Sequence, residues 1–168
     1  MFKSNTIRNS LTNALFIIYA IALFWILLFK LGVQFSYMHK RSVNLIPNAR
    51  LDGEAILNVV IFIPLGIYAG VLFKRWSFIN KLLFFFLVSV MFEVLQFIFK
   101  IGAFDITDMI TNTSGGIIGL ILFKTIEKLF NNSAKAQKFI NIIAATGTVI
   151  MISLLVLLKL NMLPIKYQ

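Results

Sequence analysis

The sequence has no cysteine, one histidine and only six acidic residues among 168. The absence of cysteine excludes disulfides, a thiolate nucleophile and any cysteine-ligated metal. The single histidine, His39, excludes a metal site built from several histidines. Because acids are so scarce, the 16 lysines and arginines leave a formal net charge of +10.

Apolar residues make up 60% of the chain, whereas a soluble domain is closer to half apolar. They form five runs, each near the length that crosses a bilayer as a helix. These runs are 11–29, 55–73, 82–99, 106–123 and 139–158. The sequence therefore predicts an all-α, polytopic membrane bundle of about five transmembrane helices, with residues 1–168 forming a single domain.

Basic residues between the runs predict the orientation of the bundle. On the N-terminal side there are two before the first run, three in 74–81 and four in 124–138. The other side has seven, spread over longer segments that include Asp52 and Glu54. Because basic residues favour the cytoplasm, we expect a cytoplasmic N-terminus, with 124–138 as a solvated connector beside anionic lipid.

Two other interpretations of the charge and of the first run are less well supported by the residues. A charge of +10 suits nucleic acid, but no basic helix or aromatic nucleic-acid motif accompanies it, so we predict no such partner. The first run follows two basic residues, as a signal peptide does. No small-residue cleavage site follows it, so we expect an uncleaved membrane anchor.

Half of the acids lie close together where the third and fourth runs meet: Glu93, Asp105 and Asp108. At 1.5 Å per helical residue, Glu93 lies roughly 9 Å below the outer end of its run, and Asn112 lies at a similar depth. An ionised carboxylate costs roughly 2.5–3.5 kcal/mol at the bilayer centre. We therefore expect Glu93 to pair, to reach water or to be protonated.

Helical spacing groups the polar residues of these runs on shared faces. Glu93, Gln96 and Lys100 lie at i, i+3 and i+7 on the third run, and Asp108 and Asn112 lie at i and i+4 on the fourth. The short connection makes the two runs antiparallel neighbours. We predict one outward-opening polar pocket. Its candidate residues are Asn58, Glu93, Gln96, Lys100, Asp105, Asp108 and Asn112.

Small residues continue the same faces. Gly115 and Gly119 follow on the fourth run, and Gly66 and Gly70 form a second four-residue pair on the second run. Such pairs let membrane helices approach closely, so we expect them to serve packing. Pro64 removes one backbone hydrogen bond, which predicts a kink in the second run.

Four segments resemble the successive motifs of VanZ-like membrane proteins. They are VNLIP (43–47), NVVIFIPLG (58–66), EVLQ (93–96) and FDITDMITNTSGGIIG (104–119), within a core of about 40–123. The resemblance implies a multi-pass protein of the bacterial plasma membrane with four or five spans. The family is named for a protein that raises resistance to the glycopeptide antibiotic teicoplanin.

The resemblance also assigns functional positions, and it has one departure. The positions carried over are Asn58, Glu93, Gln96, Asp108 and Asn112. Many relatives have an arginine just before the FD pair, where this sequence reads Gly102-Ala103. Either Lys100 replaces that charge or the site lacks it. The sequence therefore offers no bidentate arginine at this position.

Several of these residues also have a purely structural interpretation. Glu93 and Gln96 suit an interhelical hydrogen-bonded pair, and Asp108 suits a favourable charge in a first helical turn. Asp105 is expected to cap the fourth helix by accepting from the amides that follow it. Asn58 and Asn112 suit hydrogen bonding between helices.

The segment before the second run supplies the remaining candidates. We expect Asn44 and Pro47 to shape an outer loop. Arg41 and Arg50 either contact a phosphate or headgroup there or lie on the lipid surface.

Three functions fit these observations. The first is a cell-envelope protein whose pocket engages teicoplanin, a lipid-linked wall precursor or another outer-leaflet lipid, and so lowers susceptibility to lipid-tailed glycopeptides. The second is an enzyme on a lipid-linked substrate, with Glu93 and Asp108 as acid/base or as ligands of a cation together with Asp105 and Asn112. The third is a proton-coupled transporter, which the one-sided acids and the lack of an inverted repeat disfavour. The residues indicate neither a cofactor nor an oligomeric state.

Overall fold

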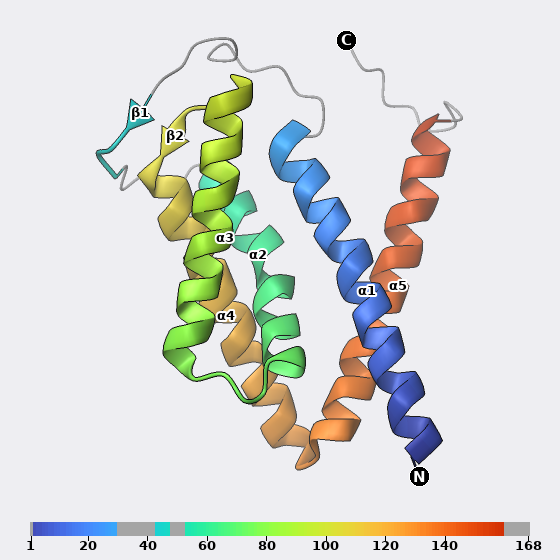
Figure 1. Ribbon diagram of the computed structural model, residues 1–168. Helices are drawn as coiled ribbons and strands as arrows, with labels where there is room; N and C mark the ends of the chain where they lie inside the picture. Colours follow the sequence, from blue (N-terminus) through green and yellow to red (C-terminus); the bar gives the residue numbers. More distant parts are fainter. Residues whose placement is uncertain (1, 30–42, 48–52, 160–168) are drawn as a thin grey trace.

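The computed structural model describes residues 2–29, 43–47 and 53–159. Within them the helices run alternately up and down a bundle (Figure 1). They are α1 (Phe2–Phe29), α2 (Gly53–Leu72), α3 (Phe78–Phe99), α4 (Ile106–Phe130) and α5 (Ser133–Lys159). All five are long and apolar enough to cross a membrane. The predicted all-α bundle with five spans is confirmed.

The prediction of a solvated connector at 124–138 is wrong. Helix α4 continues to Phe130 and α5 begins at Ser133, which leaves only Asn131 and Asn132 between them. Asn131 takes a left-handed conformation (φ 46°) that ends α4. The side chain of Asn132 accepts from the amides of residues 134 and 135 at 2.8 and 3.1 Å, which starts α5. The basic residues of this region therefore lie on helical turns.

From the sequence Lys81 is expected between two membrane runs, but it lies within helix α3. Ser77 caps α3 by accepting from the amide of Asn80, so the helix begins before Lys81. Lys81 is buried at the end of the bundle that holds the α4–α5 turn, where Lys124 and Glu127 are its electrostatic neighbours. We call this the α4–α5 end.

Glycine makes the contact of α2 and α4 the most extensive in the bundle. A Cβ placed on Gly66 would lie 2.0 Å from the carbonyl oxygen of Gly116, and one on Gly119 would lie 1.9 Å from that of Ile63. A Cβ on Gly115 would likewise lie 2.2 Å from the carbonyl oxygen of Val59 on α2. No residue larger than glycine fits here, because backbone meets backbone.

The rest of the α2 face packs against aromatic rings rather than small residues. A Cβ on Gly70 would lie 2.2 Å from the ring of Phe123. Phe62 and Phe85, both wholly buried, fill the space between α2, α3 and α4. The close backbone contact and the buried rings together form the core of the bundle.

Helix α2 runs through Pro64 without a break in its helical assignment. Just before the proline, the hydroxyl of Tyr19 on α1 donates to the backbone carbonyl of Ile61 at 2.7 Å. This bond ties α1 to α2 at the turn where proline removes a helical donor.

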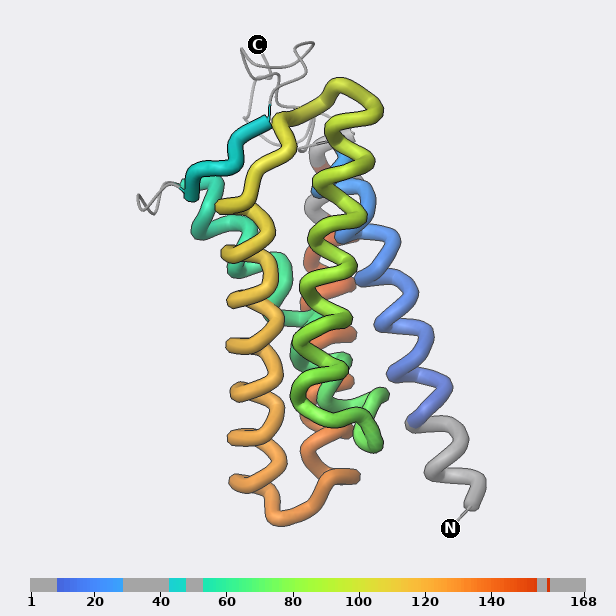
Figure 2. The backbone as a smooth tube through the Cα atoms, turned by 60° about the vertical axis from the view of Figure 1, so that its left-hand side comes forward, coloured from blue at the N-terminus to red at the C-terminus, as the bar shows by residue number. Residues whose placement is uncertain are grey.

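A two-residue parallel bridge joins segments that are distant in sequence. Strand β1 (Val43–Asn44) pairs with β2 (Phe104–Asp105), in the register Val43 to Phe104 and Asn44 to Asp105. Figure 2 shows the two segments side by side at the end of the bundle where α3 turns into α4. We call this the α3–α4 end.

Helices α1 and α5 are joined by buried polar side chains. The hydroxyl of Thr12 donates to Asn141 Oδ1 at 3.0 Å and accepts from Gln137 Nε2 at 2.8 Å. All three residues are buried. Polar pairs of this kind hold membrane helices together, because the surrounding lipid offers no competing partner.

The outside of the bundle is apolar on every helix. Large exposed side chains include Ile21, Leu57, Leu87, Ile121 and Ile142. Apolar surface outside and polar residues inside is the arrangement expected of a protein solvated by lipid. The helices therefore contact membrane lipid directly.

Candidate functional site

The site begins at the turn between α3 and α4. Lys100 takes a left-handed conformation (φ 57°), and its amide donates to the carbonyls of Gln96 and Phe97. The amide of Ile101 also donates to Gln96 at 3.0 Å. This closes α3 at Phe99, so the predicted stripe does not extend to Lys100, which is exposed while Glu93 is buried. The i+7 spacing fails because the helix ends first.

Glu93 lies at the centre of the α3–α4 hairpin. Glu93 is 1% exposed, and its Oε2 accepts a hydrogen bond from the backbone amide of Asp105 at 2.9 Å. A carboxylate with a backbone donor is far less costly to bury than a bare one. Glu93 thus links the end of α3 to β2, the residue pair that leads into α4.

Asp105 connects three elements. Its Oδ1 accepts from the amide of Thr107 at 2.7 Å and caps α4, as the sequence predicts. Its Oδ2 accepts from Asn44 Nδ2 at 2.9 Å. Together with the bond from its amide to Glu93, these contacts hold β1, α3 and α4 at one point.

We expect Asp105→Ala to destabilise the protein by about 2 kcal/mol, because it removes both the cap and the bond to Asn44. Asp105→Asn keeps a cap acceptor and should cost about half as much. Thermal unfolding of the purified protein in detergent measures both. Unfolding of Asp105→Ala at the wild-type temperature would show that the three-way contact does not stabilise the fold.

Two buried amides flank Glu93, and each uses only its nitrogen. Gln96 Nε2 donates to the carbonyl of Leu27 on α1 at 2.9 Å, and Asn112 Nδ2 donates to Ser89 Oγ at 3.0 Å. Among the described residues, Gln96 Oε1 and Asn112 Oδ1 have no hydrogen-bond partner. Gln96 is 3% exposed and Asn112 1%. Buried acceptors without donors are uncommon, and each of these oxygens can accept a further hydrogen bond.

The remaining predicted residues take no part in these hydrogen bonds as far as the structure describes them. Asn58 is buried near the start of α2, and Asp108 is half-buried in the first turn of α4. Pro47 is exposed. Arg41 and Arg50 lie outside the described residues.

Gly102 and Ala103 stand at the position where the motif resemblance leads to the expectation of an arginine. A Cβ on Gly102 would lie 3.0 Å from Gln96 Oε1, and Ala103 is half-buried beside it. The chain therefore packs closely against the free oxygen of Gln96 at this point.

The acidic residues proposed as ligands of a cation do not form a metal site in the described part of the chain. Within residues 2–29, 43–47 and 53–159, no three acidic or histidine side chains are placed so that they could hold a metal ion. Glu93 and Asp105 meet through a backbone amide instead, with both carboxylates already accepting hydrogen bonds.

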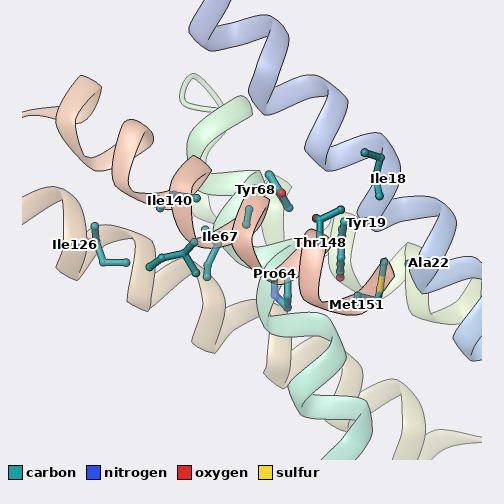
Figure 3. A pocket seen from close by; sticks show the side chains of 13 residues that line it. Ile18, Tyr19, Ala22, Pro64, Ile67, Tyr68, Ile126, Ile140, Thr148 and Met151 are labelled. Atoms are coloured by element: carbon teal, nitrogen blue, oxygen red, sulfur yellow. The ribbon is translucent and has the colours of Figure 1, made fainter. Parts of the chain in front are cut away.

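An apolar groove lies apart from the polar network, and sequence reasoning did not find it. It measures about 300 Å³ and lies between α1, α2, α4 and α5 (Figure 3). Its lining is almost entirely apolar and includes none of the predicted polar residues. Pro64 lines it, together with Tyr19 and Tyr68. No signal marks it in the sequence, because its residues are ordinary members of membrane spans.

Comparison with known proteins accounts for most of the chain. The family model described as VanZ/LLP1 matches residues 16–131. Protein VanZ of Enterococcus faecium is 41% identical over 152 residues, which cover 87% of this chain and 91% of that protein. No solved structure matched the chain. With this match and its five spans, the chain belongs to the VanZ/LLP1 family and is a multi-pass protein of the bacterial membrane.

Proposed function

We propose that the protein lowers the susceptibility of its cell to lipid-tailed glycopeptide antibiotics such as teicoplanin. It does so by binding an amphiphile of the outer leaflet at the α3–α4 end. The observation that carries this proposal is the acceptor-rich network around Glu93, in which two buried amide oxygens have no donor among the described residues.

The network suits a head group that is rich in hydrogen-bond donors. Its carboxylate and its two amide oxygens accept hydrogen bonds, and accepting groups recognise hydroxyls, amides and ammonium groups. Glycopeptides and lipid-linked wall precursors both present such donors on sugars and peptides. The proposed ligand reaches the network from the rim formed by Asp108 and Asn44, which are only partly buried.

The neighbouring strand segment supplies an apolar surface for a tail. Val43, Leu45 and Ile46 are 55%, 60% and 80% exposed. They flank Asn44, whose side chain binds Asp105. Polar and apolar recognition therefore lie side by side, as an amphiphile requires.

The distribution of charge supports an outward-facing α3–α4 end. Exposed lysines gather at the opposite end, on the last turns of α4 and the first turns of α5. Basic residues favour the cytoplasmic side. The polar network then opens toward the leaflet on which glycopeptides act.

The test is antibiotic susceptibility of a Gram-positive host that expresses the chain, compared with the same host carrying an empty vector. We expect protection against teicoplanin and much less against vancomycin, which lacks the acyl tail. Equal protection against the two drugs would contradict recognition of an amphiphile. No protection against either would contradict the proposed function altogether.

A further inference from the structure

The apolar groove is elongated along α5. Its α5 wall consists of residues 140, 143, 144, 147, 148 and 151, which share one helical face. Figure 3 shows Ile126 and Ile140 at one end of the groove and Ala22 and Met151 at the other. The wall spans about 16 Å at 1.5 Å per residue. This is close to half of the roughly 30 Å hydrocarbon thickness of a bilayer.

The groove is open to the membrane. Ile18 and Ile143 on its border are 38% and 55% exposed. The hydroxyl of Tyr19, a polar group in the lining, already donates to the backbone of α2. A dry apolar cavity of half this size, about 150 Å³, is enough to hold benzene. The groove of about 300 Å³ therefore fits a flexible hydrocarbon chain.

Gly147 keeps the groove open. A Cβ at this position would meet nothing within 4 Å. The glycines of the α2–α4 contact have the opposite surroundings, because a Cβ on Gly66, Gly115 or Gly119 would lie within about 2 Å of backbone. Gly147 thus adds no helix contact and leaves space that a side chain would occupy.

Exposed lysines lie at the membrane level of one end of the groove, on helix faces other than those that line it. Lys124 and Lys128 lie two residues to either side of Ile126 on α4, and both are exposed. Lys138 lies two residues before Ile140 on α5 and is exposed as well. Glu127 is the acid among them and is half-buried. Long lysine side chains at a helix end extend to the level of the headgroups, where they attract anionic lipid.

We infer that the groove is a binding site for one anionic phospholipid of the leaflet at the α4–α5 end. An acyl chain lies along the α5 wall past Gly147, and the phosphate lies at the level of the lysines around Ile126 and Ile140. The site shares no residue with the network around Glu93, so the inference does not depend on the proposed drug-related function.

The test is lipid binding to the purified full chain, measured by native mass spectrometry during titration with phosphatidylglycerol or with phosphatidylcholine of the same acyl chains. We expect wild type to bind phosphatidylglycerol about fivefold more tightly, which corresponds to the attraction of one lysine at the level of the headgroup. Equal binding of the two lipids would overturn the assignment of an anionic headgroup.

Gly147→Phe fills the groove and should weaken phosphatidylglycerol binding by about tenfold, the contribution of roughly two methylene groups. Val149→Phe is the matched control, since Val149 is 63% exposed and does not line the groove. Thermal unfolding confirms that both variants are folded, and Gly147→Leu replaces the larger side chain if needed. Binding by the filled variants equal to that of the control would overturn the site.

Discussion

Gly119→Ala is expected to destabilise the bundle strongly, whereas the same change at Gly147 leaves its stability unchanged. The added methyl group at position 119 would lie 1.9 Å from the carbonyl oxygen of Ile63 and 3.0 Å from the Cα of Gly66. Both are backbone atoms, so relief requires that α2 and α4 move apart along their contact. At position 147 the methyl group meets nothing within 4 Å.

We expect Gly119→Ala to lose about 3 kcal/mol of stability, the upper part of the range for overpacked cores. This corresponds to a melting temperature lower by roughly 6–12 °C for a chain of this length. Thermal unfolding in detergent and abundance in the membrane measure the effect, with Gly147→Ala as control. If both variants melted with wild type, α2 and α4 would not be packed backbone to backbone.

Glu93→Gln is expected to return teicoplanin susceptibility to that of cells without the protein. The amide has the shape of the carboxylate and can still accept from the amide of Asp105, so the hairpin should fold. What it loses is the negative charge, and a charged acceptor binds donors about twice as strongly as a neutral one. The network would then hold the proposed head group too weakly to protect the cell.

Glu127→Gln is the matched control for this variant, because it makes the same chemical change at the α4–α5 end. It should protect as wild type does. Asp108→Asn, at the rim of the site, should lose protection together with Glu93→Gln. All strains are compared at equal membrane abundance. Wild-type protection by Glu93→Gln and Asp108→Asn would mean that these acids serve the fold alone.

The five spans could be predicted from the sequence, because a membrane span is a continuous run of apolar residues and such a run can be read from consecutive positions. The same holds for the cap at Asp105, where one side chain and the amides that follow it decide the outcome. The errors lie where a helix ends. Polar composition at 124–138 resembles a loop, but two asparagines alone make the turn. Regular spacing extends to Lys100, but a left-handed residue stops the helix there.

Contacts between distant segments were not predictable from a single sequence. Asn44 and Asp105 are 61 residues apart, and neither local sequence predicts the hydrogen bond between them. The groove depends on how four helices diverge, which no single span encodes. The network around Glu93 was anticipated in part, because an acid within an apolar run is costly enough to be noticed.

The polar contact between α1 and α5 can form only late in the synthesis and membrane insertion of the chain. Thr12 and Asn141 are separated by 129 residues, so the ribosome must make nearly the whole protein before they can meet. Until then the first span enters the bilayer without its partner, and its hydroxyl can bond only to its own backbone. Only when α5 is inserted can Thr12 on α1 form its hydrogen bonds with Gln137 and Asn141. A chain cut short before α5 would therefore leave Thr12 without its two partners on α5, while the bonds of α1 to α2 and α3 could still form.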